Sequence, residues 1–261
     1  MVKVLELFSG TGSVGKCCKE LGWDVVSVDM ILPADHQVDI MDFDYKQYDK
    51  DEFDIVWASP PCTFYSNLQN CWIGRKRKDG TLVTKEWIEE QRKESDKLIL
   101  KSFEIINYFN PEFWFLENPQ TGCLRNRDVV KGLPYYDVDY CMYSDWGYKK
   151  RTRIWTNKKD FNAKLCDNSG ACGNMIEIPT NGAVHTGYKT PIKASTRKLH
   201  TNVIGDSNKN KAVRKHKKLL DKVGCGSQLN QPKDLKYLGK GTNRIDRYRI
   251  PEDLIYSLFL E

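Results

Sequence analysis

The feature that most restricts the fold of this chain is a glycine-rich turn, Phe8-Ser9-Gly10-Thr11-Gly12-Ser13-Val14-Gly15. It follows an apolar strand-like run, Val2 to Leu7, and opens a helical pattern that continues to Leu21. Glycines let a backbone turn tightly and approach a ligand closely, and the start of a helix offers free N–H groups. Asp29 ends the next strand-like run, where it can accept hydrogen bonds from ribose hydroxyls. These residues predict a nucleotide-type cofactor, and they fit NAD and S-adenosylmethionine equally well.

Strand-like and helix-like patterns alternate through the first 160 residues. Further strand-like runs are Val25–Val28, Phe53–Ala58, Phe113–Leu116, Tyr136–Tyr143 and Thr152–Thr156, and the long helical pattern is Trp87–Phe109. Strands separated by helices imply right-handed βαβ units and a mainly parallel sheet. We therefore expect an α/β, Rossmann-like fold with helices on both faces of the sheet. In such folds ligands bind at the carboxyl ends of the strands.

The character of the chain changes at about Phe161. Residues 161 to 208 are rich in Gly, Asn, Thr and Lys and have weak periodicity, and a basic helical segment, Lys209 to Lys222, follows. Ile250 to Leu260 has the pattern of a terminal helix. The sequence therefore predicts a catalytic, cofactor-binding domain over residues 1–160, a small irregular target-recognition lobe over 161–247, and a C-terminal helix over 248–261 that returns to the catalytic domain.

The formal net charge of +6 points weakly to a polyanionic partner. Arg75-Lys76-Arg77-Lys78 and the basic helical segment both fit a phosphate-contacting surface, although each also fits a solvated face. The chain has no apolar run long enough to span a membrane and no apolar signal segment at its start. We expect a monomer without a membrane partner, not secreted, in a reducing intracellular compartment such as prokaryotic cytoplasm or a viral replication site. There the nine cysteines should be thiols, metal ligands or catalysts rather than disulfides.

A second pair of motifs narrows the chemistry. Ala58-Ser59-Pro60-Pro61-Cys62 puts a cysteine on a rigid turn at the end of a strand, and Glu117-Asn118-Pro119 puts a carboxylate at the end of another. A lone cysteine is usually a buried structural residue, but one that follows Pro-Pro at a strand end is exposed to the cleft.

These residue types suit methylation of cytosine at C5, which is a poor carbon nucleophile. A thiolate that attacks C6 converts the ring to an enamine-like species, whose C5 can take a methyl group from a sulfonium. The reaction also needs a hydrogen-bond donor or acid at N3 and a cation near the intermediate, and the base must leave the duplex stack. Cys62, Glu117 and the Arg151-Thr152-Arg153 strand supply these groups.

Taken in this order, the motifs resemble those of the C5-cytosine DNA methyltransferase family across most of the chain. The matching elements are the glycine turn, Asp29, Pro61-Cys62 with Ser66, Glu117-Asn118, Gly147–Arg153 and Ile250–Leu254. Lys149-Lys150 stands where the family has Pro-Gln, and Arg247-Tyr248 replaces its Gly-Asn. The compact chain is most similar to members from phages and large DNA viruses.

The resemblance implies a double-stranded DNA substrate, S-adenosylmethionine as methyl donor, and a flipped-out cytosine bound covalently at C6 by Cys62. It assigns catalysis to Cys62, Glu117, Arg151 and Arg153. The expected cofactor contacts are Phe8, Ser9, Gly10, Thr11, Gly12, Ser13, Asp29, Met30, Asp39, Ile40 and Pro60. The expected substrate contacts are Pro61, Ser66, Asn118, Pro119, Arg75, Lys76 and Arg77. The segment from about Asn67 to Arg92 should be the loop that closes behind the base.

Four alternatives stand beside this hypothesis. The same chemistry serves a tRNA-methylating branch of the family, and an altered final motif also fits a DNA-binding relative with weakened catalysis. An enzyme that methylates exocyclic amino groups would carry an aromatic residue where Cys62 stands. An NAD oxidoreductase is permitted by the glycine turn alone.

The lobe also contains candidate ligands for a metal clip. Cys166, Cys172 and His185 follow one another in a glycine-rich region, and Cys141 is a candidate fourth ligand for zinc. A lobe with so little apolar content would gain stability from a metal. The alternative is that these are unrelated reduced residues in loops.

Overall fold

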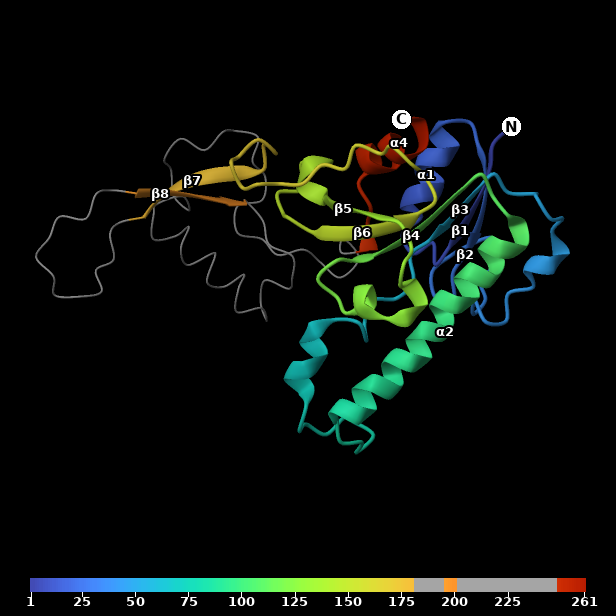
Figure 1. Ribbon diagram of the computed structural model, residues 1–261, viewed down its shortest axis with the longest axis horizontal. Coiled ribbons are helices and arrows are strands. Elements are labelled where there is room, and N and C mark those ends of the chain that lie inside the picture. Colours follow the sequence, from blue (N-terminus) through green and yellow to red (C-terminus); the bar gives the residue numbers. More distant parts are fainter. Residues whose placement is uncertain (181–194, 201–247) are drawn as a thin grey trace, which may run out of the picture. The chain divides into compact units, whose positions relative to one another are not determined.

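The structure, a computed structural model, describes residues 1–180, 195–200 and 248–261 and divides into two compact units (Figure 1). The first unit comprises Met1–Val138, Arg151–Ala163 and Ile250–Glu261, and the second comprises Asp139–Lys150 and Lys164–Arg249. Residues 139–150, which precede the predicted boundary at residue 160, thus cluster with the second unit. The predicted basic helix over Lys209–Lys222 lies outside the described residues.

A six-stranded sheet has the order β2-β1-β3-β4-β6-β5. The bounds are β1 Lys3–Leu7, β2 Asp24–Val28, β3 Ile55–Ala58, β4 Phe113–Pro119, β5 Tyr135–Asp139 and β6 Arg151–Thr156. The first four strands in this order pair in parallel, and β6 pairs with β4 in the antiparallel direction. The predicted α/β, Rossmann-like fold is confirmed.

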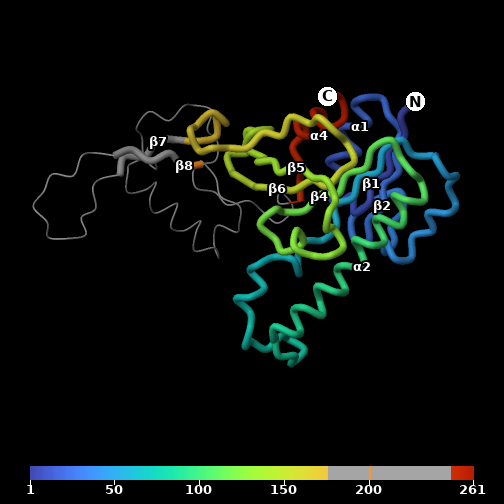
Figure 2. Tube along the Cα trace, in the orientation of Figure 1, coloured from blue at the N-terminus to red at the C-terminus, as the bar shows by residue number. Residues whose placement is uncertain are grey.

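Helices cover both faces of this sheet. α1 (Ser13–Glu20) and α4 (Glu252–Leu260) lie side by side near the two chain termini (Figure 2), and Phe259 of α4 contacts the rings of Trp57 and Phe115. α2 (Lys85–Phe109) covers the opposite face, and its cluster of buried side chains includes Leu5, Leu7, Val28, Val56, Ala58, Ile105, Ile106 and Phe109. Successive residues of a strand point to opposite faces, which is why Val56 and Trp57 join different layers.

The ends of the long helix α2 have local causes. The hydroxyl of Thr84 accepts a hydrogen bond from the Trp87 backbone N–H at 3.1 Å and caps the first turn. Asn110 follows the last turn in the left-handed conformation, with φ at 47°, and this ends the helix. Among the described helices, none is both long and apolar enough to cross a membrane.

Several elements differ from the sequence prediction. The strand expected over Tyr136–Tyr143 stops at Asp139, and a 3-10 turn continues from it. The second unit contains an antiparallel pair, β7 (Met175–Thr180) and β8 (Ser195–His200), in a region of weak periodicity. The short 3-10 segments are η1 Tyr45–Gln47, η2 Asn67–Trp72, η3 Leu124–Asn126, η4 Asp128–Val130 and η5 Tyr140–Met142.

Candidate active site

Four neighbouring strand ends form the candidate site in the first unit. Leu7 at the end of β1 pairs with Val28 of β2 and with Ala58 of β3, and Ala58 pairs with Leu116 of β4. The chain continues from these residues into the glycine turn, Asp29, the Pro-Pro-Cys turn and Glu117. Because parallel strands end at one edge, the predicted cofactor and catalytic motifs meet there.

The glycine turn is held by Asp29. Gly10 and Gly12 have φ values of 56° and 66°, which glycine adopts without strain. The Asp29 carboxylate accepts a hydrogen bond from Gly10 N at 2.9 Å, and its other oxygen accepts from Ile31 N at 2.8 Å and Leu32 N at 2.7 Å. An ionised carboxylate has about four acceptor positions, so Asp29 retains capacity for a further donor.

Glu6 is a second carboxylate at this turn, and sequence reasoning missed it. Its oxygens accept hydrogen bonds from Val14 N at 3.3 Å and Gly15 N at 2.9 Å, the unpaired donors of the first turn of α1. Burial raises the pKa of Glu6 to about 7. A Cβ at Gly15 would lie 2.8 Å from a Glu6 oxygen, so this glycine permits the close approach. The signal in the sequence is an acid between Leu5 and Leu7, inside an apolar strand.

The remaining expected cofactor residues have different surroundings. The hydroxyls of Thr11 and Ser13 lie 3.1 Å apart, and Ser13 also accepts a hydrogen bond from Ile250 N at 3.3 Å. Met30 is 57% exposed beside Asp29, whereas the Ile40 side chain is buried in the core. Phe8 and Ser9, also expected, open the turn. The Asp39 carboxylate accepts a hydrogen bond from Met41 N at 2.9 Å, and Pro60 is buried.

The turn that carries Cys62 is attached to the end of β4. Asn118, fully buried, donates a hydrogen bond from Nδ2 to the carbonyl oxygen of Pro60 at 3.0 Å. Cys62 itself is partly buried, and its carbonyl accepts from Ser66 N at 3.1 Å. Tyr65 O accepts from the backbone N–H of Cys123 at 2.8 Å, so the loop after β4 fixes the turn a second time. Pro61, Thr63 and Asn67 are exposed around this turn, and Pro119 is partly buried.

The two candidate arginines lie on β6, next to β4. Arg153 pairs with Asn118 across the strands, and Ile154 pairs with Glu117, which is 7% exposed. The Arg153 guanidinium makes two hydrogen bonds to Asp137, at 2.7 and 2.9 Å, and lies 3.5 Å from the centre of the Tyr135 ring. The hydrogen bond to Asp137 raises the pKa of Arg153 above its ordinary value. Arg151 O accepts from Gln120 N at 3.1 Å.

No family model matches the chain. It is 42% identical over 183 residues to a protein of Frog virus 3 (isolate Goorha) named "Probable DNA (cytosine-5)-methyltransferase", and the match spans 69% of this chain and 82% of that protein. The chain belongs to the DNA (cytosine-5)-methyltransferase family. The resemblance drawn from the motifs is therefore confirmed, as is the likeness to members from large DNA viruses.

Two solved structures of methyltransferases are also similar to the chain. One is described as a DNA modification methyltransferase encoded within a prophage of Escherichia coli, with 17% identity and a TM-score of 0.43. The other is a methyltransferase of Entamoeba histolytica, with 14% identity and a TM-score of 0.42. The matches cover 64% of this chain in both cases and 52% and 56% of those chains, so it spans little more than half their length.

In this methyltransferase family member the predicted closing loop, from about Asn67 to Arg92, is largely exposed. The Arg75 guanidinium lies 5.3 Å from the centre of the Trp72 ring, and the Arg77 guanidinium lies 4.7 Å from that of Trp87. Lys76, between them, forms an isolated bridge with Leu82. The basic side chains therefore stand on a loop supported by aromatic rings rather than by acids, apart from an Arg77–Asp79 ion pair.

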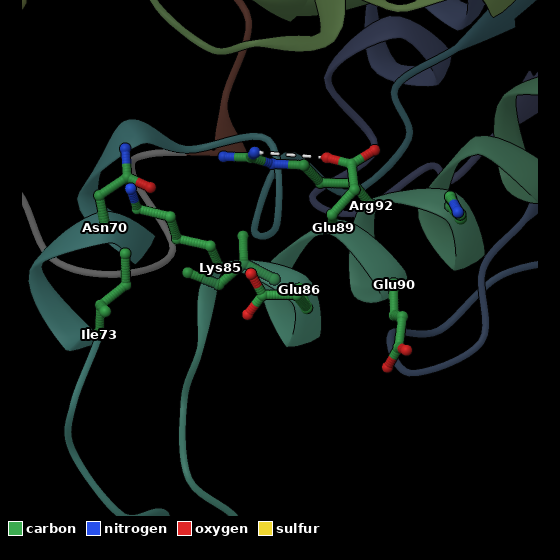
Figure 3. A pocket seen from close by; sticks show the side chains of 9 residues that line it. Asn70, Ile73, Lys85, Glu86, Glu89, Glu90 and Arg92 are labelled. Atoms are coloured by element: carbon green, nitrogen blue, oxygen red, sulfur yellow. Dashed lines mark ion pairs between the residues drawn. The ribbon is translucent and has the colours of Figure 1, made fainter.

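A pocket of about 680 Å³ lies between η2 and the first turns of α2 (Figure 3). Its lining residues are Asn70, Ile73, Lys85, Glu86, Ile88, Glu89, Glu90, Arg92 and Lys93. The figure shows the Arg92–Glu89 ion pair at one side of it, with a separation of 3.6 Å. Neither Cys62 nor the glycine turn lines this pocket, so it is a feature of the loop and not of the candidate site.

The cysteines of the predicted metal clip are brought together in the second unit. Cys141, Cys166 and Cys172 are grouped there with His200, which sequence reasoning missed. His185, the histidine chosen from the sequence, lies outside the described residues.

Proposed function

We propose that this chain transfers a methyl group from S-adenosylmethionine to C5 of cytosine in double-stranded DNA. The observation that carries the proposal is the shared edge of the sheet. There the glycine turn held by Asp29 adjoins a cysteine turn that Asn118 ties to the end of β4. The family to which the chain belongs supports the substrate and the position of methylation.

The residues at the glycine turn fit S-adenosylmethionine. Asp29 has spare acceptor capacity for the ribose hydroxyls, and the exposed side chain of Met30 offers an apolar contact for an adenine ring. We assign the further contacts to Phe8, Ser9, Gly10, Thr11, Gly12, Ser13, Asp39, Pro60 and the backbone of Ile40. When bound, the cofactor supplies an electrophilic methyl group.

The proposed reaction begins with attack of the Cys62 thiolate on C6 of the cytosine. Glu117 holds a proton against N3 and so stabilises the negative charge that moves onto the ring. C5 then takes the methyl group, a base removes the C5 proton, and the thiolate leaves. Asp137 and Tyr135 fix the plane of Arg153, which favours a hydrogen bond to the base, and Arg151 adds positive charge at the same strand.

The exposed loop and the second unit are assigned to DNA. Arg75, Lys76 and Arg77 would contact phosphates, while Pro61, Ser66, Asn118 and Pro119 would surround a cytosine that has left the duplex. The second unit, which includes the predicted target-recognition lobe, would read the base edges.

Mechanism-based trapping tests this proposal. DNA that contains 5-fluorocytosine, mixed with the chain and S-adenosylmethionine, should give a complex that survives denaturing electrophoresis, because fluorine at C5 cannot leave as a proton does. Cys62→Ser should abolish the complex, while Cys71→Ser, a control at an exposed thiol, should leave it unchanged. Equal trapping by wild type and Cys62→Ser would refute the covalent mechanism. Trapping on tRNA alone, run in parallel, would refute the DNA substrate.

A further inference from the structure

The second unit brings four metal-ligating side chains to one point. The Sγ atoms of Cys141, Cys166 and Cys172 and a ring nitrogen of His200 all lie within 4.8 Å of one another. His200 Nε2 lies 3.7 Å from Cys166 Sγ and 3.7 Å from Cys172 Sγ. A tetrahedral zinc site, with Zn–S near 2.3 Å and Zn–N near 2.0 Å, has S···N separations of about 3.6 Å. Two S···N separations therefore already match such a site, and no two of the four ligand atoms lie more than 4.8 Å apart.

The four ligands lie in separate elements of the second unit. Cys141 lies in η5, Cys166 and Cys172 lie in the irregular segment before β7, and His200 is the last residue of β8. Met175, the first residue of β7, pairs with His200 in the antiparallel register. The cluster thus joins η5 to the end of the β7–β8 pair at which Met175 and His200 stand opposite each other.

Buried polar side chains hold the backbone around the ligands. Asn174, 5% exposed, donates from Nδ2 to Cys141 O at 2.8 Å and to Cys172 O at 3.0 Å, and it accepts from Gly147 N at 2.9 Å. The fully buried Asp139 accepts from Cys166 N at 2.8 Å. Such outer contacts orient metal ligands and are the usual companions of a metal site.

The charge around the cluster also suits a metal thiolate. Three thiolates and one divalent cation carry a net charge of about −1, and Lys149 Nζ lies within the same network, 2.6 Å from Cys166 O and 3.4 Å from Asp139. Cysteine binds a metal ion as the thiolate, so a bound ion would convert this cluster of thiols into a bonded cross-link.

We propose that Cys141, Cys166, Cys172 and His200 bind one structural zinc ion. Three sulfur ligands and one imidazole complete a tetrahedron and leave no open position, which is the pattern of a structural rather than a catalytic zinc. The proposal names His200 where the sequence offered His185, and it is independent of the reaction assigned to Cys62.

Metal analysis of the purified full-length chain tests the site. Wild type should contain one zinc per chain, and His200→Ala or Cys166→Ser should lower the content to about a tenth of that. His185→Ala and Cys71→Ser are the matched controls and should keep the full content. Wild type without zinc overturns the proposal. Loss of zinc from His185→Ala together with its retention in His200→Ala overturns the assignment of the fourth ligand.

Two measurements on wild type keep the test valid if a variant does not fold. A chelator should release one equivalent of zinc, and the second unit should then be cleaved by protease before the first. Replacement of zinc by Co²⁺ should give thiolate-to-cobalt charge-transfer bands together with the strong visible bands of tetrahedral cobalt. Weak visible bands without charge transfer would show octahedral oxygen ligation and would contradict the cysteine site.

Discussion

At the scale of single residues, Asn118 is the side chain that most directly connects the sheet to the proposed nucleophile. Its Nδ2 is the donor to Pro60 O, one residue before the Pro61-Cys62 pair, and the bond is buried. We predict that Asn118→Ala slows trapping of 5-fluorocytosine DNA about tenfold to a hundredfold, since small displacements of a reacting group have effects of that size. It should also destabilise the fold by about 1–3 kcal/mol, because Pro60 O loses its buried donor. Trapping reactions quenched at a series of times give the rate of trapping, and urea unfolding gives the free energy of unfolding.

Asn157 supplies the matched control for Asn118. It accepts from Trp114 N and donates to Glu112 O, both at 2.9 Å, and so anchors the opposite end of β4. Asn157→Ala should lower stability without a comparable loss of trapping rate. If both variants slow trapping equally, the effect of Asn118 is one of general stability, and its role in positioning Cys62 is wrong.

At the scale of elements, the junction of β1 and α1 depends on Glu6. Its pKa of about 7 lies above the ordinary value of 4.5, so the folded state holds the proton more tightly than the unfolded state. The corresponding stabilisation is complete below pH 4.5 and is lost as the pH rises to about 7. The shift corresponds to roughly 3 kcal/mol. We predict that the stability of wild type relative to Glu6→Gln falls by about this amount across that window, measured by urea unfolding at a series of pH values.

Glu52 provides the control, because folding lowers the pKa of its carboxyl instead of raising it. Its hydrogen bond to Lys3 lowers the pKa of the Glu52 carboxyl, so this contribution is present above the unfolded pKa and disappears only at lower pH. Glu52→Gln should therefore change stability by a constant amount between pH 5 and 7. A Glu6→Gln difference that is equally flat would show that Glu6 is ionised in the folded state throughout.

The elements also show where sequence reasoning succeeds and where it stops. β1, β3 and β4 are buried on both faces, so they appear as apolar runs bounded by turn residues, and motifs after such runs can be placed at one edge. Tyr140 continues an apolar pattern, but β5 ends at Asp139 and the 3-10 segment η5 begins at Tyr140. Asp137 and Asn174 escaped prediction because each acts through a contact that no local pattern encodes. Glu6 does leave a local signal, an acid inside the apolar run of β1, but that signal does not identify its contacts with α1.

At the scale of the whole molecule, the chain enters the second unit twice, over Asp139–Lys150 and again from Lys164. The proposed zinc ligands follow this route, since Cys141 belongs to the first passage and Cys166 and Cys172 to the second. Spacing in the sequence suggested the three cysteines as ligands, but it pointed to His185 as the histidine and not to His200. Which histidine completes a cluster depends on strand register, and the Met175–His200 pair supplies that information only once the strands are formed.

The exposed basic cluster on the loop after the Cys62 turn predicts how DNA binding depends on salt. Each phosphate contact made by a cation contributes about 0.9 to the slope of log affinity against log salt. Arg75, Lys76 and Arg77 are exposed on the loop that follows the Cys62 turn. If all three contact phosphates, their combined replacement by Gln should reduce the slope by roughly 2–3, measured by fluorescence anisotropy with duplex DNA across a salt series.

A control variant with the same change in net charge separates direct phosphate contacts from long-range attraction between the protein and DNA. Lys46, Lys50 and Lys159 are also exposed, but Lys46 in η1 and the other two in loops lie toward the amino ends of the parallel strands, away from the Cys62 edge. Their replacement by Gln should leave the slope nearly unchanged, because exposed charges beyond a Debye length of about 8–10 Å from the duplex are screened. Equal reductions from the two triple variants would mean that net charge alone draws the DNA, and the basic loop would then lose its assignment as a phosphate-binding element.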